Sequence, residues 1–174
     1  MIIFLIGMMG SGKSSIGAQL AKGLEIDFFD LDEVISLHAG SSIAQIFEKE
    51  GEKFFRELEK EMLQGFKKEE DLVLACGGGT PCFYNNMDWM LANGIVLYLK
   101  IPVETLTERL SQTDVNDRPL LSDSTRELTN RLESLLESRK AYYEKAHFEV
   151  NADQTQQEVL ADLIFYLKRF KKGF

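Results

Sequence analysis

The sequence lacks several features that mark particular classes of protein. Only two of its 174 residues are cysteines, Cys76 and Cys82, and neither has a cysteine or histidine partner at the spacing of a metal site. Two reduced thiols suit the cytoplasm, because disulfides are rare there. No apolar run approaches the roughly 18 residues of a membrane span. The run at residues 2–6 is too short for a signal peptide and lacks its basic flank. We therefore expect a cytoplasmic protein without a membrane partner.

Basic residues are scarce relative to acidic ones. The chain has 20 Lys and Arg residues against 28 Asp and Glu residues, and its net charge is −8. A general nucleic-acid binder would show a basic surface, so we expect no nucleic-acid partner. A phosphate ligand remains compatible with this charge, because one pocket can be positive on an acidic protein.

What the chain does contain is an alternation of apolar runs with helical patterns. Strands are expected at residues 2–6, 27–29, 72–76, 95–99 and 147–150. Helices are expected at residues 13–23, 42–49, 53–68, 86–92, 103–110, 124–145 and 154–171. Strands spaced by helices form a parallel sheet that is covered on both faces. The sequence therefore predicts a single α/β domain over residues 1–174, with a polar loop at residues 111–124.

A complete phosphate-binding motif follows the first strand. Residues 7–14 read GMMGSGKS, which matches G-x-x-x-x-G-K-[ST]. The glycines let successive backbone N–H groups face one concavity, and the helix that begins near Lys13 adds its positive end. Lys13 can reach the β- and γ-phosphates of a nucleotide, and Ser14 can offer a hydroxyl to Mg²⁺. A glycine-rich turn that binds nothing is the alternative, but the preceding strand and the following helix favour a phosphate loop.

The remaining sequence narrows the class of P-loop protein. The strings N-K-x-D and D-x-x-G, which a GTPase would need, occur nowhere in the chain, and the length leaves no room for the domains of a motor. A small-molecule kinase remains. Asp30 and Asp32 follow the second strand on what we expect to be extended chain, where one carboxylate could hold Mg²⁺ through water and the other could face a substrate hydroxyl. A solvated turn or a helix cap is the alternative for this pair.

Three arginines and a glycine triplet complete the candidate residues. Arg56 lies three residues before Glu59, a spacing that also suits a surface ion pair. Arg118 lies in the long polar loop, which has the length of a lid, and Arg139 lies in a helix; either could be an ordinary surface residue. The triplet at residues 77–79 follows a strand, and three glycines there suggest the close approach of a ligand, although a tight turn before Pro81 is the alternative.

Together these segments resemble the shikimate kinases, a family of small P-loop enzymes of aromatic amino-acid biosynthesis. The similar features are GMMGSGKSS, DLD, FRELE, the glycine triplet, RPLL and R-x-x-x-Y at Arg139. They come in the family's order and cover nearly the whole chain. The resemblance implies a nucleoside-monophosphate-kinase-like α/β/α domain with a five-stranded parallel sheet. It also implies transfer of the ATP γ-phosphate to the 3-hydroxyl of shikimate, with Mg²⁺ as cofactor and ATP, ADP and shikimate as partners.

The resemblance assigns the phosphate side of the site. The nucleotide phosphates would be wrapped by Gly10, Ser11, Gly12, Lys13, Ser14 and Ser15. Ser14 would ligate Mg²⁺ and Asp30 would reach it through water. Arg118 would come onto the ATP phosphates from a lid at about residues 111–124. Lys13 and Arg118 would act in catalysis by stabilising the charge of the transferred phosphate.

The acceptor side follows in the same way, within a region at about residues 31–62 and the glycine triplet. Asp32 would bind the substrate hydroxyls and serve as a base. Arg56 and Arg139 would hold the shikimate carboxylate, which suits their planar donor forks. The triplet, at Gly78 and Gly79, would contact a ring hydroxyl. We expect a monomer.

Some positions depart from the family pattern or are weakly marked. Cys76 precedes the triplet where a threonine or serine is more usual, and Ala141 follows where a proline is often found near the arginine. Arg109 could stack on adenine, with residues 151–154 flanking the base. The alternatives are a gluconate-type or nucleotide kinase, and a nucleotide-binding module without catalysis. The intact Lys13, Ser14, Asp30 and Asp32 speak against the latter.

Overall fold

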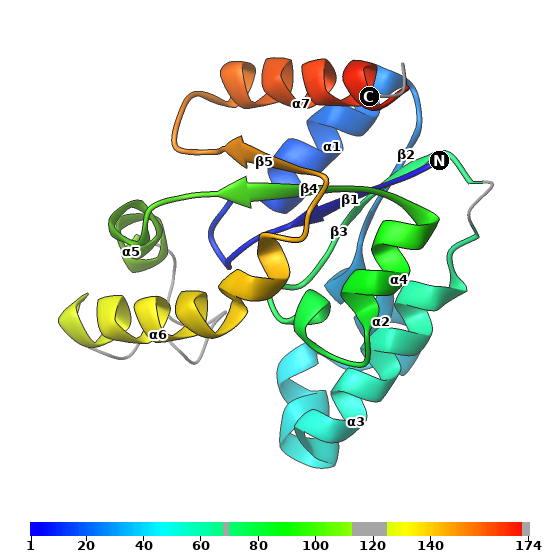
Figure 1. Ribbon diagram of the computed structural model, residues 1–174. Coiled ribbons are helices and arrows are strands. Elements are labelled where there is room, and N and C mark those ends of the chain that lie inside the picture. Colours follow the sequence, from blue (N-terminus) through cyan, green and yellow to red (C-terminus); the bar gives the residue numbers. More distant parts are fainter. Residues whose placement is uncertain (68–69, 113–124, 172–174) are drawn as a thin grey trace.

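The centre of the protein is a sheet of five parallel strands in the order β2-β3-β1-β4-β5 (Figure 1). The computed structural model describes residues 1–67, 70–112 and 125–171. The strands are β1 (Ile2–Ile6), β2 (Asp27–Asp30), β3 (Leu72–Ala75), β4 (Gly94–Lys100) and β5 (Phe148–Asn151). The α/β class and the five-stranded parallel sheet expected from the sequence are therefore confirmed.

The central strand explains the apolar run at the start of the chain. All five residues of β1 are buried, because a strand with helices on both faces has no side that faces water. Leu5 lies opposite Ala75 of β3 on one side and opposite Leu97 of β4 on the other. The loop that follows β1 therefore starts from the centre of the sheet, between the loops that follow β3 and β4.

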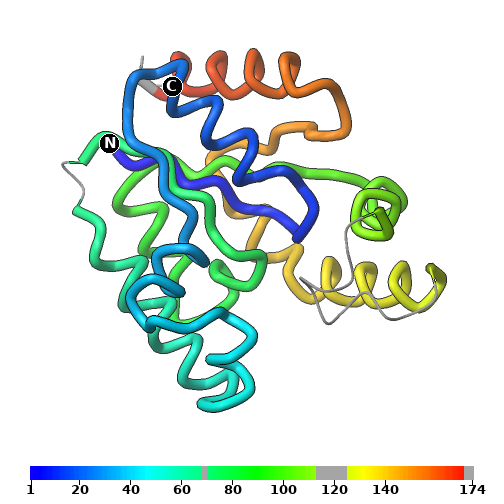
Figure 2. The backbone as a smooth tube through the Cα atoms, turned by 180° about the vertical axis from the view of Figure 1, so that it is seen from behind, coloured from blue at the N-terminus to red at the C-terminus, as the bar shows by residue number. Residues whose placement is uncertain are grey.

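Helices cover both sides of this sheet. They are α1 (Lys13–Leu24), α2 (Leu31–Ala39), α3 (Ile43–Gly65), α4 (Asn86–Asn93), α5 (Val103–Ser111), α6 (Thr125–Tyr143) and α7 (Gln156–Lys171), with a 3₁₀ turn η1 (Thr80–Cys82). Helices α1 and α7 lie together on one side, and α2, α3 and α4 lie on the other (Figures 1 and 2). Helices α5 and α6 pack against each other beyond the carboxyl end of β4. Within the described ranges, no helix has the length and apolarity to cross a membrane.

The segment after β2 differs from the prediction. The sequence predicts extended chain through Asp30 and Asp32, but Asp30 ends β2 and caps helix α2, and its Oδ1 accepts a hydrogen bond from the amide of Asp32 at 3.0 Å. Aspartate is a favoured N-cap because its side chain satisfies an otherwise unpaired helix amide. Asp32 consequently lies in the first turn of a helix that the sequence pattern does not predict.

The two helices predicted at residues 42–49 and 53–68 are joined in α3. Ser42 and Gln45 form the predicted capping box at its start, with reciprocal hydrogen bonds of 3.1 and 3.3 Å. Gly51, at a φ of 79°, kinks the helix between the two predicted segments. The sequence therefore locates the break correctly, although the chain resumes the helix at once instead of forming a loop.

A histidine side chain extends the pairing of β4 with β5. The amide of His147 donates to the carbonyl of Val96 at 3.0 Å, and the amide of Val96 donates to Nδ1 of His147 at 3.0 Å. Only a neutral imidazole offers a nitrogen that accepts a hydrogen bond. Burial lowers the pKa of His147 below its usual range. This edge of the sheet is therefore stabilised by the neutral ring.

Acidification is expected to weaken that edge. The unfolded chain binds the proton more readily, so stability starts to fall below about pH 6.5 and the loss is complete below the folded-state pKa. The free energy of unfolding should fall by about 1 kcal/mol, the contribution of one hydrogen bond. This corresponds to a fall of ~2–4 °C in melting temperature. Thermal melts between about pH 8 and pH 5 check this against His147→Asn, which keeps an acceptor but does not titrate. Equal acid losses in the two proteins would contradict the prediction.

Candidate active site

The loops that carry the predicted site residues meet at the carboxyl ends of the strands, where open α/β sheets bind ligands. The phosphate loop, residues 7–12, follows β1, and the glycine triplet, residues 77–79, follows the neighbouring strand β3. The amide of Cys76 donates to the carbonyl of Leu5 at 3.0 Å. This bond joins the two strands directly before the loops diverge, so the loops start side by side.

The phosphate loop has the backbone of an anion site. Gly10 and Gly12 have φ values of 80° and 87°, in the left-handed region that glycine adopts without strain. Gly12 directly precedes α1, and no side chain caps this end of the helix. The N–H groups of Lys13, Ser14 and Ser15 therefore lie in an uncapped first turn, which can bind an anion. Ser15 also accepts a hydrogen bond from Gln156 at 3.1 Å, which ties α1 to α7.

Lys13 lies across its own loop. Its Nζ donates to the carbonyls of Gly7 at 3.0 Å and Met8 at 2.8 Å, and it lies 3.3 Å from Ser11 Oγ. The ammonium group is thus held at the concavity by backbone oxygens. A flexible lysine can exchange such partners for the oxygens of an anion, so the contacts keep the positive charge within the loop.

The two predicted magnesium ligands are in contact. Ser14 Oγ donates to Asp30 Oδ2 at 2.5 Å, while Oδ1 of the same carboxylate caps α2. Among residues 1–67, 70–112 and 125–171, no group of three or more His, Cys, Asp or Glu side chains could hold a metal by itself. Mg²⁺ commonly uses one or two protein oxygens and fills its shell with water and phosphate. The Ser14–Asp30 pair fits that pattern.

The carboxyl group of Asp32 has a raised pKa. Although the residue as a whole is exposed, surrounding protein atoms desolvate its carboxylate, and the charges of Asp30 and Glu59 add to this effect. Together they raise the pKa of Asp32 to about 6, against the opposing influence of Lys13 and Arg56. A carboxylate with such a pKa can exchange a proton near neutral pH.

Charged side chains approach each glycine of the triplet closely. A Cβ atom on Gly77 would lie 3.2 Å from Asp32 Oδ1, and one on Gly78 would lie 3.0 Å from an Nη atom of Arg139. On Gly79 it would lie 2.6 Å from an Nη atom of Arg56, closer than atoms can approach. The structure therefore brings Arg56 and Arg139 together over consecutive glycines. We refer to this group of residues, Asp32, Arg56 and Arg139 together with the glycine triplet, as the acid pocket.

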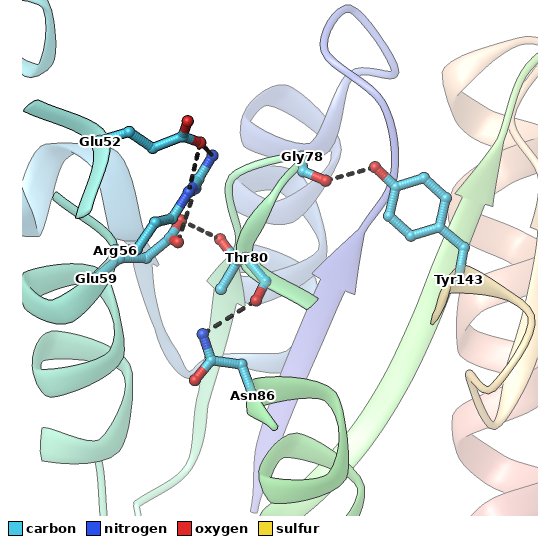
Figure 3. Close-up of polar contacts among 7 residues, drawn as sticks. All are labelled: Glu52, Arg56, Glu59, Gly78, Thr80, Asn86 and Tyr143. Carbon is cyan, nitrogen blue, oxygen red and sulfur yellow. Dashed lines mark hydrogen bonds and ion pairs between the residues drawn. The ribbon is translucent and has the colours of Figure 1, made fainter. Parts of the chain in front are cut away.

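Arg56 is held by a network that the simple surface-pair interpretation misses (Figure 3). Its side chain is only 11% exposed, and one Nη atom donates to Glu59 at 2.8 Å. Glu59 is fully buried and accepts a second hydrogen bond, from Thr80 Oγ1 at 2.6 Å. The guanidinium group also lies 4.3 Å from the ring centre of Phe83. The ion pair is therefore a buried support for the guanidinium group and not a surface feature.

Arg139 is placed by α6 and its neighbour Tyr143. The two residues are four apart and so share one face of the helix. Tyr143 is fully buried and its hydroxyl donates to the carbonyl of Gly78 at 2.6 Å (Figure 3). Burial raises the pKa of Tyr143, with Arg139 opposing the shift, so the phenol remains a donor. The spacing R-x-x-x-Y therefore binds α6 to the triplet at the point where Arg139 reaches it.

The residues suggested for adenine lie together beside the phosphate loop. Arg109 donates to the carbonyl of Gly10 and to the carbonyl of Ala152, both at 3.4 Å. The contact joins α5, the phosphate loop and the segment after β5. Arg118 and most of the proposed lid, residues 113–124, lie outside the described residues.

The sequence gives no sign that Thr80 and Phe83 belong to the site, whereas it does mark Cys76 as unusual. Thr80 and Phe83 carry no motif, because their partners lie about twenty residues or more away in α3. Cys76, noted as a departure from the family, is buried against Met90 and its thiol has a raised pKa because of that burial. It therefore belongs to the core.

Comparison with known proteins gives this geometry a context. The family model described as shikimate kinase matches residues 9–168. Shikimate kinase of Salinibacter ruber is 41% identical over 170 residues, which cover 94% of this chain and 83% of the relative. Shikimate kinase of Sulfurihydrogenibium is 38% identical over 168 residues, which cover 96% and 98% of the two chains.

Solved structures agree with the sequence relatives. The crystal structure of shikimate kinase from Bacteroides thetaiotaomicron superposes with a TM-score of 0.92 at 32% identity and covers 96% of this chain and 98% of the other. Shikimate kinase from Acinetobacter baumannii, solved in complex with shikimate, gives a TM-score of 0.87 at 36% identity over 99% and 95% of the chains. The family match, the relatives and the shared fold lead to one conclusion: this chain belongs to the shikimate kinase family.

Proposed function

We propose that the site described above performs the reaction of this family, the transfer of the γ-phosphate of ATP to the 3-hydroxyl of shikimate, which gives shikimate 3-phosphate and ADP for aromatic amino-acid biosynthesis. The phosphate loop binds the nucleotide and the acid pocket binds shikimate. The convergence of Arg56 and Arg139 over the triplet supports this division most directly, because it provides two planar cations for one carboxylate beside a phosphate loop.

In this proposal the acceptor hydroxyl is placed by the acid pocket. Arg56 and Arg139 hold the carboxylate, and the small residues Gly78 and Gly79 let the ring approach the backbone. Asp32 accepts a hydrogen bond from the acceptor hydroxyl and takes its proton as the phosphate is transferred. Phosphoryl transfer depends mainly on alignment and on charge stabilisation, so the neighbouring position of the two loops is the main contribution of the fold.

On the donor side, the residues stabilise charge. Lys13 exchanges its carbonyl partners for phosphate oxygens, and the first turn of α1 adds its N–H groups. Ser14 and Asp30 hold Mg²⁺, which neutralises the phosphates when it is bound. We assign Arg118 to the same task from a lid at residues 111–124. The proposal includes a monomer in the cytoplasm, and sedimentation equilibrium checks the monomeric state.

A coupled ADP-release assay with shikimate, gluconate and nucleoside monophosphates tests the proposal. Turnover with shikimate and none with the other acceptors is the expected result. If the protein instead prefers gluconate or a nucleotide as acceptor, it is another kind of small-molecule kinase. ATP binding without any transfer would indicate a silent nucleotide-binding module.

The acid substrate must compete with a carboxylate of the protein. Glu52 Oε1 lies 3.3 and 3.4 Å from two nitrogens of Arg56, and its side chain is 59% exposed (Figure 3). Glu52→Gln is expected to lower the KM for shikimate by about 2- to 5-fold, because an exposed pair contributes roughly 0.2–1 kcal/mol. Initial rates at saturating ATP check this.

Glu57→Gln is the matched control for that variant. Glu57 is similarly exposed on the same helix, but it pairs with Lys53 at 4.0 Å and not with Arg56. Its KM for shikimate should equal that of the wild type. A higher KM in Glu52→Gln would show that Glu52 positions Arg56 and does not compete with the substrate.

A further inference from the structure

The buried hydroxyl of Thr80 donates a hydrogen bond to Glu59, the carboxylate that pairs with Arg56. Thr80 is 0% exposed, and its hydroxyl donates to Glu59 Oε1 at 2.6 Å. The other oxygen, Oε2, accepts from an Nη atom of Arg56 at 2.8 Å. A buried carboxylate is costly unless its oxygens have donors. Thr80, Glu59 and Arg56 thus form a continuous chain of hydrogen bonds from η1 to the acid pocket (Figure 3).

The position of Thr80 is itself fixed. Its amide donates to the carbonyl of Gly77 at 3.1 Å, which closes the turn of the triplet. Its carbonyl accepts from Nδ2 of Asn86, a fully buried residue at the start of α4, at 3.0 Å. Threonine is also stiff at χ1. The hydroxyl is therefore presented to Glu59 by a rigid backbone and not by a flexible side chain.

The carboxylate of Glu59 lies close to a second carboxylate, that of Asp32. The Cβ position on Gly77 lies 3.2 Å from Glu59 Oε1 and 3.2 Å from Asp32 Oδ1, so both carboxylates border the same small space. Like charges there repel each other. The hydrogen bond from Thr80 holds Oε1 on the η1 side, and this leaves Oε2 aligned with Arg56.

We propose that Thr80 is a positioning residue for the acid substrate: through Glu59 it fixes the direction in which Arg56 presents its donors to the substrate carboxylate. The inference deepens the proposed function and rests on it. The chain of hydrogen bonds ends at Arg56: within the described residues it runs from Asn86 to Thr80, from Thr80 to Glu59 and from Glu59 to Arg56, and it does not pass through the phosphate loop. Removal of the hydroxyl should therefore affect the acid substrate and leave the nucleotide unaffected.

Thr80→Val tests this, because it removes the hydroxyl and preserves the shape. The KM for shikimate is expected to rise about tenfold, the size of effect that follows when a buried charged group loses a hydrogen bond. The kcat and the KM for ATP should stay within about twofold of the wild type. Thr80→Ser, which restores the hydroxyl, should return the KM for shikimate to within about twofold. A purely structural role for Thr80 would instead affect both substrates together.

Thr107→Val is the matched control. Thr107 is also buried, and its hydroxyl donates to the carbonyl of Val103 at 2.9 Å and lies 3.3 Å from Thr129 Oγ1, between α5 and α6. It tests the general effect of burying a valine in place of a threonine. Its KM for shikimate should match that of the wild type.

The possible outcomes separate this inference from the proposed function. An unchanged KM for shikimate in Thr80→Val, a parallel rise in the KM for ATP, or a serine variant that stays impaired would each overturn the role of Thr80. If the valine variant does not fold, Thr80→Ala replaces it, and calorimetric binding of ADP confirms a folded phosphate loop. A wild-type protein that does not phosphorylate shikimate would reject the proposed function, and calorimetric binding of shikimate to wild type and variant would then decide the role of Thr80.

Discussion

Replacement of Asp32 by asparagine is expected to lower kcat with shikimate by about 10²- to 10⁴-fold, the usual contribution of a positioned acid or base. The amide can still accept a hydrogen bond from the acceptor hydroxyl, but it cannot take the proton. ATP binding should be nearly unchanged, because the phosphate loop and the Ser14–Asp30 pair are intact. The coupled assay measures kcat, and calorimetry with ADP measures the nucleotide site. Retained activity would remove Asp32 from the mechanism.

The same variant should be more stable than the wild type in the absence of ligands. Because the pKa of Asp32 is raised to about 6, the folded protein carries an unfavourable ionised carboxylate above that pH. The gain in melting temperature should therefore be greatest above about pH 6 and should diminish as the pH falls towards the unfolded value near 4. Thermal melts of the metal-free proteins over this range check the sign. A lower melting temperature above pH 6 would show that the carboxylate stabilises the fold, and would weaken its assignment to chemistry.

Replacement of Arg139 by alanine is the second large effect. The KM for shikimate is expected to rise about 10- to 100-fold, because a charge-assisted hydrogen bond contributes roughly 1.5–3 kcal/mol. The KM for ATP should change little, since the hydrogen bonds of Lys13 and Ser14 described above are made to Gly7, Met8, Ser11 and Asp30, and Arg139 approaches the phosphate loop only at the sulfur of Met8, at 4.0 Å, among the contacts described. Initial rates with each substrate varied in turn separate the two constants.

Lys140→Ala is the control for this variant. Lys140 is the next residue of α6 and is exposed, and its Nζ lies 3.9 Å from Glu144 Oε1. Loss of this positive charge should leave the KM for shikimate unchanged. Loss of nucleotide binding in Arg139→Ala would contradict the assignment of Arg139 to the acid, and a normal KM for shikimate would leave Arg56 as the sole anchor of the carboxylate.

The sequence predicts most of the fold because the information is local. The uninterrupted apolar run of β1, the capping box at Ser42 and the glycine-rich turn before α1 each state a structural need within a few residues. The sequence does not predict helix α2, because Asp30 and Asp32 together resemble a pair of ligands on extended chain. In the structure, Oδ1 of Asp30 caps the helix and Oδ2 of the same residue contacts Ser14.

The acid pocket is only partly predictable for the opposite reason. Arg56, Arg139 and the triplet stand out as residue types, but their meeting depends on the order of the strands and on the packing of α3 and α6. The support from Thr80 to Glu59 joins positions 21 residues apart, and nothing near either residue in the chain indicates the other. Residue types therefore identify the candidate site residues, but only the tertiary structure shows which of them lie together.

The backbone bond between β1 and β3 has a consequence for how this scaffold can change its acceptor. The amide of Cys76 and the carbonyl of Leu5 fix the separation of the donor and acceptor loops, and Gly78 lies so close to Gly7 that an added Cβ would be 3.3 Å from its carbonyl oxygen. In the proposed reaction, the distance over which the phosphoryl group is transferred would thus be set by the sheet. In that reaction, substitutions in α2 and α3, which carry Asp32 and Arg56, could change the accepted alcohol without altering that distance, so selectivity and reaction geometry could evolve separately.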